Sequence, residues 1–214
     1  PGTKWAYSNH GFALLGEIVA RIEGHPIEDV MRSRVFEPLG MANTDCLDRP
    51  NADLTTGYHR ALNHDEHDIL DLLGKDPPEE APVDGYNIRG RYQWVRPRAC
   101  GAVQSTIPDM ARFAYALLRK GGGIVQPSTF ETMTVAHWRP DERLIGIGLP
   151  FLLRRRFGRR MFGHTGGIAG GWNSALTVIP EEDLAVAVHI NLTSDMSSDV
   201  ESHIVQAVLN APPP

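Results

Sequence analysis

The last third of the chain alternates apolar runs with very short connections, and this feature constrains the fold more than any other. Segments rich in Ile, Val and Leu follow one another closely, at 144–153, 160–164, 172–179 and 184–190. The links at 156–159 and 180–183 are too short for a crossover connection, so they join antiparallel neighbours. The sequence therefore predicts an antiparallel sheet in this region.

Helical periodicity dominates the earlier part of the chain and returns at its end. Apolar residues recur every three or four positions through 7–23, and Gly24 follows where a C-terminal cap is expected. Further helices are expected at about 26–34, from Ser105 or Thr106 to Gly121, at 127–136 and at 195–209. In the last of these, one apolar face consists of Val200, Ile204, Val205 and Val208. Helices followed by antiparallel strands indicate an α+β fold.

Residues 42–98 interrupt this pattern. They are mostly irregular in sequence, and the stretch 64–84 is acidic and rich in proline. Since a structureless connection of this length is usually functional or disordered, we expect a loop near a site, with a short helical turn at 69–73. Tyr86, Tyr92 and Trp94 either anchor this loop or line a substrate cleft. We treat 1–214 as a single domain that contains 42–98 as a long irregular loop region.

Composition excludes several classes of function. The 214 residues carry a net charge of −5, which provides no basic field for nucleic acid. No apolar run reaches the roughly 18 residues that a membrane span needs. Cys46 and Cys100 form no metal or redox motif, and the sequence leaves open whether they are reduced or joined. The sequence does not determine a cellular compartment.

Two short motifs carry chemistry, and their surroundings match a known family. Tyr7-Ser8-Asn9 starts the first helix, and His164-Thr165-Gly166-Gly167 ends a predicted strand. The first motif lies in a segment that, with the later 36–41, resembles the Y-x-N region of class C β-lactamases, D-alanyl-D-alanine carboxypeptidases and related esterases. His164-Thr165-Gly166 resembles the H-T-G form of the K-T-G motif of these proteins. The resemblance covers nearly the whole chain and is weakest across 45–98.

The resemblance implies a β-lactamase/DD-peptidase-like fold and a serine acyl hydrolase that cleaves amide or ester bonds in a small molecule or peptide. It implies no metal or organic cofactor. The catalytic residues would be Tyr7, in proton transfer, and His164. A phenol normally titrates near pH 10, so it acts as a base near neutrality only beside cations. The substrate-binding residues would be Asn9, Thr165, Gly166 and Gly167, with the Gly167 N–H as an oxyanion donor.

Histidine replaces the usual lysine of the second motif. Because histidine titrates near neutral pH and lysine does not, we predict a reaction rate that changes between about pH 5 and pH 8 through His164.

A third motif of the family, S-x-x-K, is not found. No Ser in the chain is followed by Lys three positions later. In the family this motif precedes Y-x-N, so we expect the chain to be the C-terminal portion of a longer protein. A preceding segment of the same protein would then be needed to complete the site, and the chain alone would be inactive. The alternative is a catalytically inactive relative that binds a peptide or cell-wall ligand.

Three other patterns in the sequence are interpreted as structural features without a role in a site. The His- and acid-rich stretch 59–68 matches no metal-ligand template and is expected to be a solvated loop. The arginines of 154–160 are expected to be exposed charges beside a hairpin turn. His189 lies in an apolar strand, where a packed histidine is expected.

Overall fold

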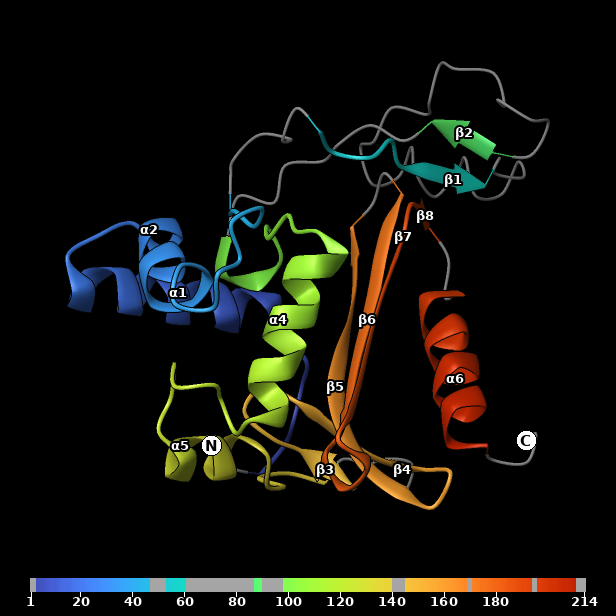
Figure 1. The fold of residues 1–214 in the computed structure, drawn as a ribbon. Helices are drawn as coiled ribbons and strands as arrows, with labels where there is room; N and C mark the ends of the chain where they lie inside the picture. Colours follow the sequence, from blue (N-terminus) through green and yellow to red (C-terminus); the bar gives the residue numbers. More distant parts are fainter. Residues whose placement is uncertain are drawn as a thin grey trace.

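The computed structural model confirms the α+β fold (Figure 1). It describes residues 3–46, 53–60, 87–89, 98–139, 145–168, 171–193 and 196–210. Its main sheet has five strands in sequence order, each antiparallel to the next, as the short links predict. The strands are β3 (Gly146–Ile147), β4 (Leu152–Arg156), β5 (Arg159–Ile168), β6 (Trp172–Ile179) and β7 (Leu184–Ile190).

The two predicted hairpins close with residues in the left-handed region. Between β4 and β5, Phe157 and Gly158 have φ of 50° and 72°, which gives the turn a twist that matches its strands. Between β6 and β7, a 3₁₀ turn at Pro180–Glu182 (η3) ends at Asp183, whose φ is 47°.

Two strand predictions were wrong in extent. The run 144–153 is not one strand, because the chain bends between β3 and β4 at 148–151, where Pro150 has no N–H to donate to a sheet. The strand expected at 160–164 continues to Ile168, because 165–168 pair with 172–175 of β6. The motif His164–Gly167 therefore lies within a strand rather than after one.

Helices cover both faces of the sheet (Figure 1). On one face are α4 (Ile107–Leu118) and α5 (Pro127–Met133), and α6 (Met196–Leu209) lies on the other. The α4 side buries Leu117, Phe130, Phe151, Leu153, Phe162 and Val178. The α6 side buries Met161, Ile179, Val186, Val188 and Val205. Burying a side chain of this size stabilises the fold by about 1.5–3 kcal/mol.

The buried face of α6 differs from the expected one. Val205 is fully buried, but Ile204 and Val208 are exposed. Ser197 and Glu201 share the buried face with Val205 at four-residue spacing. The helix is rotated so that Val205 enters the core, and small or polar residues accompany it.

The helical region consists of α1 (Asn9–Glu23), α2 (Ile27–Met31) and a π-helical turn at Arg32–Phe36 (η1). A 3₁₀ turn at Arg98–Cys100 (η2) contacts α1 and α2. Ser8 caps α1 by accepting a 3.0 Å hydrogen bond from Gly11 N, and Gly24 ends it with φ of 71°. Both ends of this predicted helix are confirmed to within two residues.

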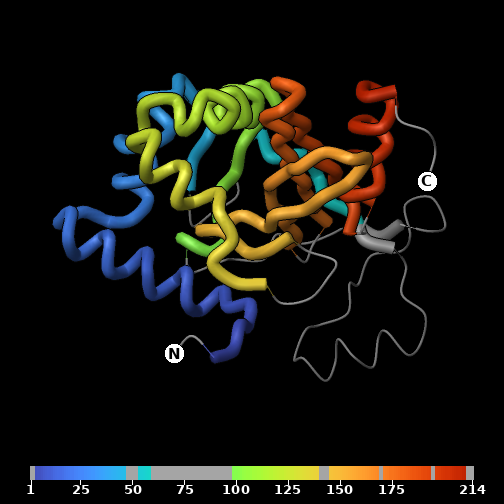
Figure 2. The backbone as a smooth tube through the Cα atoms, turned by 90° about the horizontal axis from the view of Figure 1, so that it is seen from below, coloured from blue at the N-terminus to red at the C-terminus, as the bar shows by residue number. Residues whose placement is uncertain are grey.

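The apolar stripe of α1 is largely exposed, although such periodicity usually marks a buried face. Leu14 and Ile22 are 62% and 77% exposed, and Leu15 is also exposed. The buried contact is made instead at Gly16, where an added Cβ would lie 2.3 Å from the Ala99 Cβ. Figure 2 shows α1 running along the outside of the molecule from the N-terminal end.

A second, small sheet lies beyond one end of the main sheet. Its strands are β2 (Asn87–Arg89), β1 (Tyr58–Arg60) and β8 (Leu192–Thr193), in that order, and β1 runs parallel to β8. The prediction of a mostly irregular 42–98 therefore misses two three-residue strands. The suggested turn at 69–73, and Tyr86, Tyr92 and Trp94, lie outside the described residues.

Two further features bear on the sequence predictions. Cys46 and Cys100 are not joined in a disulfide, which settles the alternative left open above. Within the described part of the chain, no helix is long and apolar enough to cross a membrane.

Candidate active site

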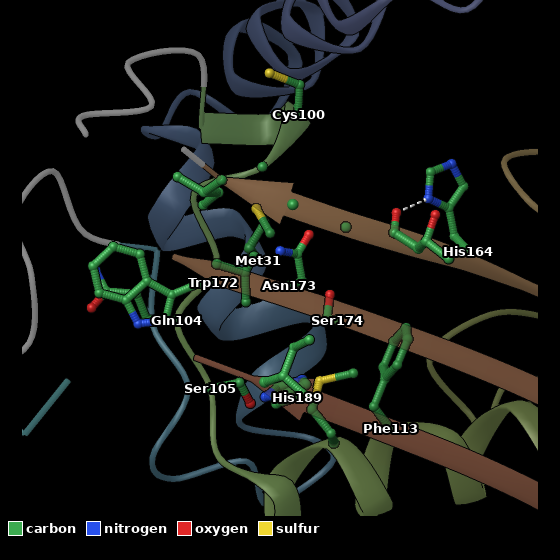
Figure 3. Close-up of a pocket in the computed structure, with 18 of the residues that line it drawn as sticks. Met31, Cys100, Gln104, Ser105, Phe113, His164, Trp172, Asn173, Ser174 and His189 are labelled. Carbon is green, nitrogen blue, oxygen red and sulfur yellow. Dashed lines mark hydrogen bonds between the residues drawn. The ribbon is translucent and has the colours of Figure 1, made fainter. Parts of the chain in front are cut away.

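A cavity of about 640 Å³ lies where the helical region meets the main sheet (Figure 3). Its walls come from six parts of the chain: Tyr7 before α1, residues around η1, Leu54, the segment from Cys100 to Ser105, the start of α4, and strands β5 to β7. Apolar side chains contributed by the helical region and α4 are Met31, Val35, Phe36, Met41, Met110 and Phe113. The sheet contributes the whole of His164–Ile168.

Tyr7 and His164 meet at this cavity, although they are far apart in the sequence. Their ring centroids lie 6.0 Å apart, with the planes inclined by 32°. Tyr7 is 58% exposed, whereas His164 is half-buried. The structure thus brings together the two residues that the sequence proposes as catalytic, and both are accessible from the cavity.

The imidazole of His164 is held by its own strand. Its Nδ1 forms a hydrogen bond with the carbonyl oxygen of Thr165. A carbonyl oxygen only accepts, so Nδ1 carries the hydrogen. In the neutral ring, Nε2 then keeps its lone pair and is able to accept a proton. The backbone of β5 therefore selects the tautomer of this histidine.

The glycines of β5 are required by close neighbours on β6. A Cβ at Gly163 would lie 1.8 Å from the carbonyl oxygen of Leu176. At Gly166 it would lie 2.8 Å from Ser174 Oγ, and at Gly167 2.5 Å from Asn173 Oδ1. Gly163 therefore lets the backbones of β5 and β6 approach more closely than any other residue would allow, whereas the neighbours of Gly166 and Gly167 are side-chain atoms that can move away.

One edge of β5 is open beside the cavity. Strand β4 pairs with β5 only as far as Gly163, whereas β6 pairs with β5 as far as Ile168. Among the described residues, no strand lies against the other edge of 164–168. Backbone N–H and C=O groups at such an edge are available to pair with an extended ligand.

Asn9 does not join this arrangement. It is the first residue of α1, it is exposed, and it is not part of the cavity wall. Thr165, Gly166 and Gly167 do line the cavity. The structure therefore brings five of the six proposed site residues together and leaves Asn9 outside.

The sequence did not predict that one row of neighbouring residues across β5, β6 and β7 would line the cavity. Gly166, Ser174 and His189 are directly opposite one another on β5, β6 and β7. Ser174 and His189 both line the cavity, with Phe113 of α4 beside them (Figure 3). Alternation along β7 could have revealed this, because Ala185, Ala187 and His189 share one face and Val186 and Val188 share the other.

The interpretation of His189 as a packed histidine was wrong. Its side chain is exposed and lines the cavity. The surrounding atoms still restrict its access to water, and this desolvation lowers the pKa of His189 below its usual value. The ring therefore favours its neutral form.

The described wall of the cavity contains no Asp, Glu, Lys or Arg. Its titratable side chains are Tyr7, Cys100, His164 and His189. In the described ranges, no three His, Cys, Asp or Glu residues are grouped closely enough to hold a metal ion. The arrangement supplies proton-transfer groups and backbone donors, which are the requirements of acyl transfer.

Comparison with known proteins identifies the family that has this fold. The chain belongs to the beta-lactamase family, whose model matches residues 1–210. Penicillin-binding protein 4 of Amycolatopsis lactamdurans is 30% identical, over 89% of this chain and 48% of its own length. D-aminopeptidase of Brucella anthropi is 23% identical, over 99% of this chain and 36% of its own length.

A solved structure supports the same relationship. D-amino acid amidase from Ochrobactrum anthropi SV3, complexed with D-phenylalanine, superposes with a TM-score of 0.75 at 26% identity. The match covers 98% of this chain and 61% of that one. The chain spans about half the length of the first curated relatives that it matches.

Proposed function

We propose that the protein is a serine acyl hydrolase that cleaves amide or ester bonds through an acyl-enzyme. In this proposal Tyr7 and His164 are the catalytic groups, and the nucleophilic Ser is supplied by a segment of the same protein outside residues 1–214. The observation that carries the proposal is the meeting of Tyr7 and His164 beside the open edge of β5. Relatives named penicillin-binding protein, D-aminopeptidase and D-amino acid amidase support it.

The proton-transfer steps follow from the Tyr7–His164 pair. The seryl oxygen attacks the substrate carbonyl carbon while its proton passes to the Tyr7 oxygen. Tyr7 then returns this proton to the leaving nitrogen or oxygen as the scissile bond breaks. His164 supports the cycle by lying beside Tyr7, with ring centroids 6.0 Å apart, where its imidazole would stabilise charge that develops during proton transfer. Water repeats the sequence on the acyl-enzyme and releases the acid.

The open edge of β5 would hold the substrate in an extended conformation. The Gly167 N–H would stabilise the oxyanion, and Thr165 would offer its hydroxyl to a carboxylate. Gly166 has no side chain to obstruct the edge, and Ser174 Oγ lies behind it. D-alanyl peptides, β-lactams and small esters all fit an edge of this kind, because each presents a carbonyl beside groups that can pair with the backbone.

The experiment uses the full-length protein and measures hydrolysis of p-nitrophenyl butyrate and of D-phenylalanine amide. Replacing Tyr7 by Phe removes the proton-transfer oxygen, and we expect kcat to fall by about 10²–10⁴-fold. His164→Asn is expected to reduce kcat by about 10²-fold. Tyr115→Phe is the matched control, because Tyr115 is equally exposed, lies on α4 and is not part of the cavity wall. Equal rates for the parent and Tyr7→Phe would contradict the proposal.

The second candidate function is a catalytically inactive relative that binds a peptide or cell-wall ligand. One observation favours it, namely the absence of S-x-x-K from these 214 residues. Mass spectrometry of the full-length protein after incubation with benzylpenicillin separates the two candidates. A covalent adduct on a Ser supports the hydrolase, whereas reversible binding of a D-alanyl peptide, without an adduct or turnover, supports the binding protein.

A further inference from the structure

A short segment, residues 54–58, crosses the end of the main sheet and is held there by three hydrogen bonds. We call this segment the strap. Trp172 Nε1 donates to the Thr55 carbonyl oxygen at 2.9 Å, and Asn191 Nδ2 donates to the Thr56 carbonyl oxygen at 2.9 Å. Tyr58 N donates to the Asn191 carbonyl oxygen at 2.8 Å. The strap is therefore attached to residues at the ends of both β6 and β7.

Close backbone packing fixes the strap further. Gly171 has φ of +107°, and a Cβ added there would lie 2.1 Å from Tyr58 N. Gly57 is buried, and Tyr58 pairs with Leu192 in the parallel contact of β1 with β8. A segment with this many main-chain contacts keeps one position relative to the sheet, so it is suited to form a wall of a binding site.

The strap and its anchor supply an apolar wall at one end of the open β5 edge. Leu54 and Trp172 both line the cavity, and Trp172 bonds to the backbone of Thr55, the residue that follows Leu54. Ile168 and Ile190 line the same end. The wall lies beyond Gly167 in the direction in which β5 runs, since Ile168 pairs with Trp172.

If the proposed function holds, the roles of Thr165 and Gly167 determine the direction in which a substrate lies along β5. There Thr165 binds a carboxylate, which in a D-alanyl peptide belongs to the leaving group, and the Gly167 N–H contacts the reacting carbonyl. The acyl side of the substrate then continues toward Ile168 and the wall. We propose that Leu54 and Trp172 form an acyl-side subsite that selects substrates with an apolar aliphatic or aromatic group next to the reacting carbonyl.

The test compares p-nitrophenyl hexanoate with p-nitrophenyl acetate, using the full-length protein. The two esters share a leaving group, so the ratio of their kcat/KM values reports the acyl side alone. The parent is expected to prefer the hexanoate. Leu54→Ala is expected to lower the ratio about tenfold, because several methylene contacts are lost, whereas Leu54→Met retains them and restores the ratio. Leu14→Ala is the matched control, since Leu14 is exposed on α1 and outside the cavity.

Trp172→Phe tests the attachment of the strap. It keeps an aromatic wall but removes the Nε1–H that holds Thr55. We expect KM for the hexanoate to rise about threefold more than KM for the acetate. Hydrolysis of both esters with the parental ratio in Leu54→Ala would overturn this inference and leave the proposed function intact. Failure of the parent to hydrolyse either ester contradicts the proposed function itself.

Discussion

Asp109 offers the sharpest test of how the cavity walls are held in place. It lies in the first turn of α4 and its side chain is fully buried. Its carboxylate accepts hydrogen bonds from Asn43 N at 2.7 Å, Thr44 Oγ1 at 2.9 Å and Arg112 Nη1 at 2.9 Å. These bonds tie the segment after Met41 to α4, and Met41 and the α4 residues Met110 and Phe113 line the cavity.

Replacing Asp109 by Ala removes all three hydrogen bonds at once. The Arg112 pair adds little, because Arg112 is half exposed and water screens it. The hydrogen bonds that Asn43 N and Thr44 Oγ1 donate to the buried carboxylate contribute about 1.5–2 kcal/mol each. We therefore expect Asp109→Ala to lower the free energy of unfolding by about 3–4 kcal/mol.

Urea unfolding monitored by circular dichroism measures this change, and the midpoint should fall by about 1–2 M if m is unchanged. The control is Asp199→Ala, because Asp199 occupies the first turn of α6 but is exposed, and a loss below about 1 kcal/mol is expected there. A loss of 1 kcal/mol or less for Asp109→Ala would refute the view that this carboxylate holds the two elements together.

Two further predictions concern the core and the sheet. Burial, with a smaller contribution from Asp45, raises the pKa of the Cys46 thiol from 9.0 to about 11. The folded protein holds this proton more tightly than the unfolded chain, so the stabilisation is present below pH 9 and is lost as pH rises through 11. Urea unfolding between pH 8 and pH 11 should show a loss of about 2–3 kcal/mol that Cys46→Ala lacks. Gly163→Ala would place a Cβ 1.8 Å from the Leu176 carbonyl oxygen, so we expect at least about 3 kcal/mol of destabilisation. Gly11→Ala is the comparison, because its φ is not positive and the nearest atom to its added Cβ is Ser8 Oγ at 3.4 Å. An equal or larger loss there would show that steric contact is not the cause.

The sequence predicts those parts of the fold that depend on local constraints. Short links force β4 to β7 into antiparallel pairs, and Gly24 supplies the predicted C-terminal cap of α1. The open edge of β5 was harder to predict from the sequence, because glycines are poor strand formers. Its final residues are extended because β6 pairs with them, and this depends on a contact between elements.

Other features depend on which face of a helix or strand packs against the rest of the chain. Both α1 and α6 show apolar periodicity, yet α1 packs through Gly16 and α6 through Val205. Helical periodicity alone does not decide which of several apolar positions is covered. For His189 the apolar character of its strand was misleading, since β7 has two faces and only one is filled with valines. Tyr7 and His164 were found because each belongs to a recognisable motif, whereas Ser174 belongs to none.

The attachment of the strap affects the order in which parts of the protein fold during synthesis. The Asn191 side chain reaches Thr56 across 135 positions of sequence, so the strap has no anchor until most of the chain has left the ribosome. Contacts between such distant segments close slowly, because a long loop must first be ordered. The strap is therefore attached to the residue after β7 only once Asn191 has been synthesised. During synthesis, the apolar side chains of the unfinished cavity wall stay open to water, so this is the stage at which a chaperone would be of greatest use to the nascent chain.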